Sequence, residues 1–188
     1  ADSHLIAWLH AKGIHYDIIT DEELHNDGIT TLKDYAAVTT GSHPEYHTSQ
    51  MLDALTAYRD GGGSLLYLGG NGFYWKIVRH SDDPDLLEIR RAEDGLRAWA
   101  SEPGEYYNAF DGSYGGLWRR NGRPPQKLVG IGFTAQGTFV GMPYNRVCHD
   151  PKFSWVFEGI EGDVVGDFGF SGNGAAGYEL DRIDPALS

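Results

Sequence analysis

A strand–helix–strand pattern with short connections constrains the fold of this chain more than any other feature. Small and β-branched residues predict a buried strand at 36–40, and a second apolar run predicts another strand at 65–68. Between them, Thr48 is a candidate N-cap for an amphipathic helix that the glycines at 61–63 end. Two strands joined through a helix by short loops are typical of a parallel sheet with a right-handed crossover, so we expect an α/β fold.

The segment before this unit continues the alternation of helix and strand. Apolar residues at helical spacing predict a helix around 5–9, and Tyr-Asp-Ile-Ile-Thr at 16–20 predicts a short strand. Asp21 is the expected cap of a brief turn that follows. The alternation supports the α/β reading.

From about residue 77 the chain becomes richer in glycine and charge. Short strands are expected there, among them 128–133 and 153–157. Since no repeat or low-complexity linker interrupts the sequence, we expect a single domain over 1–188. Its α/β half is 1–76, and 77–188 is a strand-rich, irregular C-terminal half.

Charge and cysteine content exclude several kinds of partner. The chain has 15 Lys and Arg against 27 Asp and Glu, a net charge of −12, whereas nucleic-acid binding requires clustered cations. No apolar run approaches the roughly 20 residues that span a bilayer, so we expect neither nucleic-acid nor membrane partners.

Cys148 is the only cysteine, which leaves no internal disulfide and favours a cytoplasmic location. Its neighbours His149 and Asp150 do not make it a nucleophile, because adjacent residues of an extended chain point to opposite faces.

The first candidate site is the loop at 42–47, directly after the strand at 36–40. It places His43, Glu45 and His47 within five residues of one another. A carboxylate suits hard cations such as iron, manganese or magnesium, and a neighbouring neutral histidine can act as a base or orient the ligand. The alternative is that Glu45 or His47 caps the helix that follows.

The second candidate site is the glycine-rich loop at 69–75, after the strand at 65–68. Glycines around Asn71 let backbone and amide converge on a ligand, as an oxyanion or carbonyl site requires. The alternative is a tight turn followed by core aromatic residues. Because the carboxyl ends of parallel strands meet at one sheet edge, we expect Glu45 and Asn71 to share a pocket.

A third cluster lies near the C-terminus, where Glu179, Asp181 and Arg182 occur together. These residues could form a surface ion pair of little energetic value, or they could return a general base to the site. Neither a phosphate-binding loop nor a dinucleotide-binding glycine motif occurs in the chain, so nucleotide binding has no support.

The two loops and their surroundings resemble the large (β) subunit of N,N-dimethylformamidase. The resemblance runs through Thr-Thr-Gly-Ser-His-Pro-Glu-Tyr at 39–46, the glycines at 62–63 and Tyr-Leu-Gly-Gly-Asn-Gly-Phe-Tyr-Trp at 67–75. The lead-in at 8–21 and the tail at 176–181 fit in the same order. The resemblance implies a class I glutamine-amidotransferase-like (flavodoxin-like) domain with a mainly parallel sheet, within a longer polypeptide.

The same resemblance implies an activity and a set of site residues. The activity is hydrolysis of N-substituted formamides (N,N-dimethylformamide to dimethylamine and formate) at one ferric iron held by two tyrosines and a glutamate. Glu45 matches the glutamate ligand, His43 a neighbouring site histidine, Asn71 a polar site residue, and Glu179 a candidate base. The tyrosine ligands fall in sequence before this chain, so we expect the 188 residues alone to lack iron and activity.

The resemblance also implies partners: the remainder of the large subunit, a small subunit, further copies in a homo-oligomer, and a small amide substrate. A glutamine-amidotransferase mechanism is disfavoured, because the glycine-rich turn carries Asn71 rather than a cysteine nucleophile. The alternative to an enzyme is a non-catalytic amidotransferase-like module used for ligand binding or assembly.

Overall fold

The structure, a computed structural model, divides the chain into two compact units. One consists of Ala1–Phe133 with Asp181–Ser188, and the other of Thr134–Leu180. The residues that the structure describes are 2–91, 104–138, 140–167 and 174–187.

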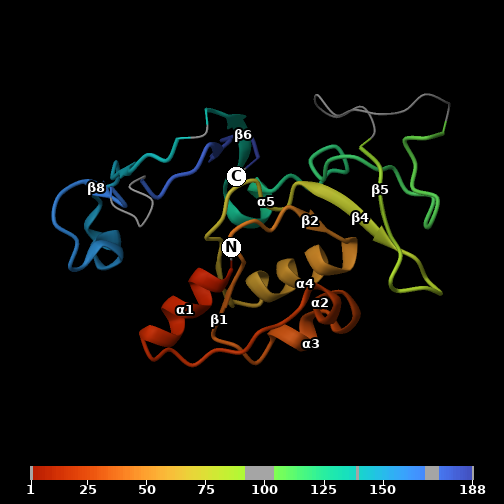
Figure 1. The fold of residues 1–188 in the computed structure, drawn as a ribbon, viewed down its shortest axis with the longest axis horizontal. Coiled ribbons are helices and arrows are strands. Elements are labelled where there is room, and N and C mark those ends of the chain that lie inside the picture. Colours follow the sequence, from red (N-terminus) through yellow and green to blue (C-terminus); the bar gives the residue numbers. More distant parts are fainter. Residues whose placement is uncertain (1, 92–103, 139, 168–173, 188) are drawn as a thin grey trace. The chain divides into compact units, whose positions relative to one another are not determined.

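The first unit carries most of the regular structure (Figure 1). Its elements are α1 (Ser3–Ala11), α2 (Asp21–Asp27), α3 (Ile29–Leu32), β1 (Ala37–Thr39), β2 (Tyr46–His47), α4 (Ser49–Asp60), β3 (Ser64–Leu66), β4 (Trp75–Arg79), β5 (Leu87–Ile89) and α5 (Gln126–Val129). The chain leaves this unit along β6 (Gly132–Gln136) and returns along β9 (Glu179–Arg182), and these two strands pair with each other. No described helix has the length and apolar character needed to cross a bilayer.

The second unit contains little regular structure. Strands β7 (Tyr144–Asn145) and β8 (Val164–Val165) form an antiparallel pair. Between them lies a 3₁₀ helix, η2 (Pro151–Phe157), whose N-cap Asp150 accepts a hydrogen bond from the Lys152 amide at 3.0 Å. Asp150 therefore stabilises the start of this helix.

The predicted parallel crossover is present. Strands β1 and β3 pair in parallel with Val38 opposite Leu65, and α4 connects them. Strand β2 pairs in parallel with β4, which pairs antiparallel with β5. The described residues thus form a mixed α/β fold with separate sheets of two or three strands, and a continuous flavodoxin-like sheet is not shown among them.

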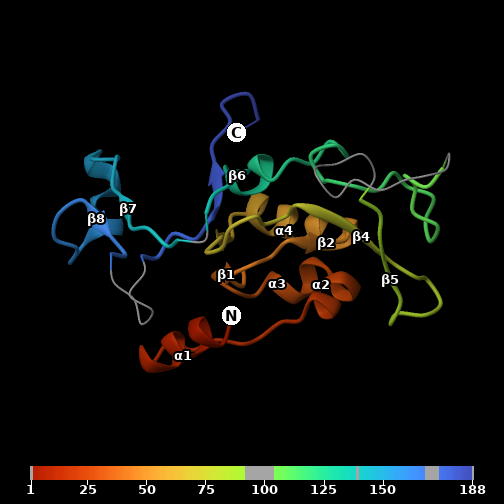
Figure 2. The same cartoon turned by 45° about the horizontal axis from the view of Figure 1, so that its top comes forward.

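Helix α4 organises the hydrophobic core of the first unit. In both views of the fold α2 and α3 lie beside it (Figures 1 and 2). The residues of the buried cluster are Leu24, Leu32, Met51, Leu52, Ala54, Leu55, Tyr58, Phe73 and Trp118. Five of them lie on one face of α4 at helical spacing, so the burial of this face fixes α4 against its neighbours. Phe73 ties the glycine-rich loop to the same core.

Thr48 caps α4, as the sequence predicted. Its hydroxyl accepts the Met51 amide at 3.3 Å and lies 2.8 Å from Nδ1 of His25. This contact links the cap of α4 to His25 on α2. Burial, followed by the charge of Arg79, lowers the pKa of His25 and favours the neutral ring.

Replacing Thr48 by alanine should reduce the free energy of unfolding by about 1–2 kcal/mol, since a buried N-cap and its hydrogen bond to His25 are both lost. Urea unfolding measures the change. Thr48→Ser retains the hydroxyl and should recover most of the loss. A serine variant as unstable as the alanine variant would mean that the methyl group, not the cap, is responsible.

Three predictions about the first 40 residues are wrong in detail. Residues 16–20 belong to no strand, because they have no ladder partner among the described residues. Thr20, not Asp21, caps α2: its hydroxyl accepts the Glu23 amide at 3.2 Å, and the Glu23 carboxylate accepts the Thr20 amide at 2.8 Å. The strand at 36–40 is not buried, since only Val38 of β1 is half-covered.

In the C-terminal half, the strand predicted at 128–133 is confirmed only from Gly132 onward, and the strand predicted at 153–157 is wrong. Residues 126–129 form α5, which ends at Gly130 in the left-handed conformation (φ 80°), and β6 begins only at Gly132. Residues 151–157 form the 3₁₀ helix. Pro151 stands at its start with a fixed φ, and Asp150 caps it, so local start signals outweigh the aromatic content of the segment.

Candidate functional site

The two loops singled out in the sequence lie against each other in the first unit. Beyond the β1–β3 pair, the Thr40 amide donates to the Leu66 carbonyl at 3.0 Å. The amides of Tyr74 and Trp75 then donate to the Glu45 carbonyl at 3.0 and 2.9 Å. Backbone hydrogen bonds therefore join the loop after β1 to the loop after β3, both before His43 and Asn71 in the chain and at Glu45 itself.

Gly69 allows this close approach. A Cβ atom at this position would lie 2.6 Å from the Ser42 carbonyl oxygen and 3.0 Å from the Pro44 ring. Any larger side chain would push the two loops apart. The absence of a side chain at Gly69 therefore lets the loop that contains Asn71 pack against the loop that contains Glu45.

Glu45 lies at the centre of the polar cluster. Its side chain is 15% exposed, and its two oxygens have different partners. Oε2 lies 3.0 Å from Nε2 of His43, while Oε1 accepts a hydrogen bond from the Asn71 amide nitrogen at 3.3 Å. The structure thus brings together Glu45, His43 and Asn71, and the expected proximity of Glu45 to Asn71 is confirmed.

The helix-capping alternative for this loop is wrong. The N-cap of α4 is Thr48, and the Glu45 side chain is engaged with His43 and Asn71 instead. His47 does not cap the helix either, because its ring is buried beside Phe73 with ring centroids 4.8 Å apart. The carboxylate of Glu45 is therefore held in place without serving the nearest helix.

Asn71 is buried and conformationally unusual. Only 5% of the residue is exposed, and its backbone is left-handed, with φ at 56°. The carboxylate of Glu45 accepts only from a donor, so the amide nitrogen must face Glu45 and the amide oxygen must point away. Among the described residues that oxygen, Oδ1, has no hydrogen-bond partner. A buried acceptor left in this way favours a ligand or water as its partner.

His47 is buried near this cluster but has a different character. It is 4% exposed, and burial lowers its pKa to about 3. Its Nδ1 has no hydrogen-bond partner in the part of the chain that the structure describes. The ring is therefore neutral at physiological pH and packs as part of the core.

The C-terminal strand β9 contributes Asp181, a carboxylate of the third sequence cluster, in which Glu179 was the predicted base. Asp181 Oδ1 accepts the backbone amide of Asn71 at 3.0 Å, and its Oδ2 accepts the Tyr67 hydroxyl at 2.7 Å. Glu179, the predicted base, belongs to the second unit, so its role stays a prediction. Glu179 and Asp181 both occupy half-buried positions of β9, and their occurrence together near the C-terminus was the sequence signal for both.

The described residues do not complete a metal centre by themselves. No group of three or more histidine, cysteine, aspartate or glutamate side chains among them is arranged to hold a metal ion. His43 and Glu45 contribute one imidazole and one carboxylate, and an iron site with further oxygen ligands needs donors in addition to these. We therefore derive no reaction step through a metal from this chain.

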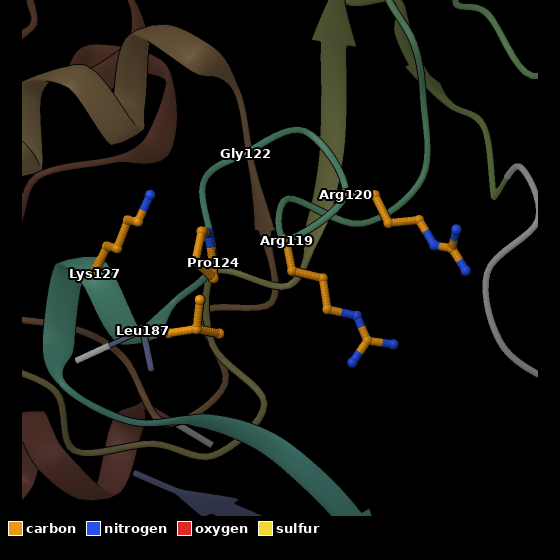
Figure 3. A pocket seen from close by; sticks show the side chains of 6 residues that line it. All are labelled: Arg119, Arg120, Gly122, Pro124, Lys127 and Leu187. Carbon is orange, nitrogen blue, oxygen red and sulfur yellow. The ribbon is translucent and has the colours of Figure 1, made fainter. Parts of the chain in front are cut away.

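An open pocket in the first unit involves none of these residues. It is lined by Arg119, Arg120, Gly122, Pro124, Lys127 and Leu187. Three of the six are cations, which would suit an anion. Figure 3 shows, however, that the charged ends of Arg119, Arg120 and Lys127 point in different directions and do not converge on one point. The pocket is therefore not the candidate site.

These features define a class of protein first: a mixed α/β domain in which a carboxylate, an imidazole and a buried amide meet at the ends of two parallel strands. The family follows from comparison with known sequences. The profile of the family described as N,N-dimethylformamidase beta subunit-like, C-terminal, matches residues 1–188, and the chain belongs to this family.

Two curated relatives support the assignment. The N,N-dimethylformamidase beta subunits of Alcaligenes sp and Paracoccus aminophilus are each 42% identical to this chain over 193 residues. The matches cover 100% of this chain but 25% of each relative, so the chain spans a quarter of their length. The resemblance inferred from the loop motifs is thereby confirmed.

Proposed function

We propose that this chain supplies part of the active site of an amidohydrolase that cleaves N-substituted formamides, N,N-dimethylformamide among them. The observation that carries the proposal is the state of Glu45. Its carboxylate is largely buried, each oxygen has its own partner, and it serves no helix. The relatives are named as N,N-dimethylformamidase beta subunits, and this name supplies the substrate class.

The proposed metal is one ferric iron, with Glu45 as the ligand from this chain. When bound, such an ion supplies Lewis-acid polarisation of the amide carbonyl and acidifies water. The remaining ligands would come from outside these 188 residues, in the remainder of a longer polypeptide. His43 holds one oxygen of Glu45 and Asn71 the other, so both would orient the ligand as the outer partners of metal ligands do.

The other roles follow from the hydrogen-bonding capacity of each group. Asn71 gives one N–H to Glu45, which leaves its second N–H to donate to the oxygen of a tetrahedral intermediate. His43, 48% exposed at the edge of the cluster, would move protons between substrate and water. Glu179 is the proposed general base, and it acts by taking a proton from the attacking water.

Several wider features belong to the same proposal. The domain would adopt the class I glutamine-amidotransferase-like arrangement once its sheets are completed by the rest of a longer polypeptide. We also propose that the protein has a cytoplasmic location, and that it assembles with a small subunit and with further copies of the large subunit. The second candidate function is a non-catalytic module for binding or assembly, favoured by the incomplete donor set of the described residues.

A full-length polypeptide containing this chain, purified with its small subunit, tests the proposal. We expect dimethylamine to be released from N,N-dimethylformamide and about one iron per large subunit by metal analysis. A protein that folds, contains no iron and releases no dimethylamine would support the non-catalytic module instead.

Asn71→Ala should keep the iron in this protein and lower kcat by roughly 100-fold, the effect of losing one oxyanion donor. Steady-state kinetics and metal analysis on the same preparation measure both quantities. The control is Asn26→Ala, at an exposed position on α2, which should leave both unchanged. An unaltered kcat in Asn71→Ala would remove Asn71 from the proposed machinery.

A further inference from the structure

We propose that Asp181 and Tyr67 are positioning residues that fix the turn at Asn71 and thereby aim its side-chain amide at Glu45. The proposal rests on the proposed function for its effect on catalysis. The hydrogen bonds that it invokes are testable without any enzyme assay. The two residues lie 114 positions apart in the chain.

The turn needs such support because its backbone is strained. Asn71 and Phe73 both have positive φ angles, 56° and 54°. Asparagine tolerates the left-handed region, but a phenylalanine in that region is a genuine outlier that persists only where its surroundings enforce it. Burial of the Phe73 ring in the core supplies one anchor. It does not by itself hold the backbone of Asn71.

Three consecutive backbone amides provide the remaining anchors. The amide of Asn71 donates to Asp181 Oδ1 at 3.0 Å, and that of Gly72 donates to the Tyr67 hydroxyl at 2.7 Å. The amide of Phe73 donates to the Pro44 carbonyl at 2.7 Å. Every backbone donor of the strained segment is therefore satisfied, and two of the three acceptors are the side chains of Asp181 and Tyr67.

The Tyr67 hydroxyl links the two acceptors into one unit. It accepts from Gly72 and donates to Asp181 Oδ2 at 2.7 Å, so it uses both of its hydrogen-bonding functions. The carboxylate of Asp181 in turn receives one donor on each oxygen. A Cβ at Gly72 would lie 2.6 Å from the Tyr67 ring, so the glycine admits the ring to this position.

Fixing the backbone of Asn71 also fixes the direction in which its side-chain amide points. With the backbone of Asn71 fixed by Asp181, its side-chain nitrogen lies 3.3 Å from Glu45 Oε1. Loss of the carboxylate would let the turn relax toward an ordinary backbone conformation and would swing the amide away from Glu45. Asp181 and Tyr67 thus act on the proposed chemistry only through Asn71.

Amide hydrogen exchange on the protein, read residue by residue by NMR, tests the hydrogen bonds directly. In Asp181→Ala we expect exchange of the Asn71 amide to accelerate by about 10- to 100-fold, the effect of losing a hydrogen bond to a charged acceptor. In Tyr67→Phe the same acceleration should occur at the Gly72 amide. Amides in the middle of α4 should change less than threefold in either variant.

The chain offers a matched control pair. Tyr35 donates to Asp17 Oδ2 at 2.8 Å, a tyrosine–aspartate hydrogen bond like that of Tyr67 and Asp181. Asp17→Ala and Tyr35→Phe should leave exchange at Asn71 and Gly72 unchanged.

The inference is overturned if Asn71 exchange in Asp181→Ala stays within twofold of the unmodified protein. Equal acceleration throughout the core would assign Asp181 a merely stabilising role and overturn it as well. If Asp181→Ala fails to fold, Tyr67→Phe decides the question alone.

The catalytic consequence is measured in the full-length polypeptide. Asp181→Ala should lower kcat for N,N-dimethylformamide at least tenfold with KM within threefold, because a misdirected Asn71 weakens a transition-state contact more than substrate binding. Asp17→Ala should leave both constants unchanged. Altered exchange in a protein that shows no hydrolysis even before substitution would reject the proposed function and retain the positioning role. Normal kcat with altered exchange would reject the positioning role in catalysis.

Discussion

Replacing Glu45 by alanine in a full-length polypeptide of this family is expected to remove the bound iron and abolish hydrolysis of N,N-dimethylformamide. Residues that only orient a metal ligand typically contribute about 10- to 100-fold to metal affinity or activity, so loss of the ligand itself should exceed 100-fold. Metal analysis, the visible absorption of ferric phenolate and dimethylamine release measure the outcome together.

The same substitution separates the two candidate functions. Glu45 does not cap α4, so its loss should not reduce stability by the roughly 1 kcal/mol of a missing cap; any cost arises from the unpaired Asn71 amide. Glu161→Ala, at an exposed position of the second unit, is the control and should keep iron and activity. Full iron content with near-normal turnover in Glu45→Ala would contradict the assignment and favour a non-catalytic module.

The contact between Glu45 and Asn71 could be predicted from the sequence because it depends on local rules. A helix of clear periodicity lies between two short strands, and the loops that follow those strands meet wherever the strands are parallel neighbours. The helix N-cap at Thr48 was equally predictable, since capping involves residues only three positions apart.

The role of Asp181 could not be predicted in the same way. Glu179 and Asp181 occupy equivalent half-buried positions of one strand, and nothing in their local sequence says which carboxylate meets a turn 110 residues away. Such a choice depends on tertiary packing. For the same reason the segment at 16–20 has the residues of a strand but not its structure, because a strand also requires a neighbour.

His47 illustrates a further limit of sequence reading. The pattern His-Pro-Glu-Tyr-His places two imidazoles on either side of one carboxylate, within five residues. His43 lies 3.0 Å from Glu45, whereas His47 lies on β2 and is buried beside Phe73. Burial, and not distance along the chain, therefore sets the charge of His47.

Stability should fall steeply in mild acid because of His47. In the unfolded chain its pKa is 6.5, and in the folded protein it is about 3. Between these values the unfolded state takes up a proton that the folded state does not, so the free energy of unfolding decreases as pH falls from 6.5 toward 3. The slope is at most about 1.4 kcal/mol per pH unit, or about 2 kcal/mol lost by pH 5.

Urea unfolding at neutral pH and near pH 5 measures this loss, and His47→Leu isolates its origin. Leucine keeps an apolar side chain against Phe73 but takes up no proton, so the variant should lose about 2 kcal/mol less than the unmodified protein over the same interval. His25, whose pKa is also lowered, contributes with the same sign in both proteins and cancels in the comparison. The exposed His15, replaced by leucine, should leave the acid dependence unchanged. An equal loss in His47→Leu and the unmodified protein would mean that the folded state accepts the proton, which burial of this ring beside Phe73 should prevent.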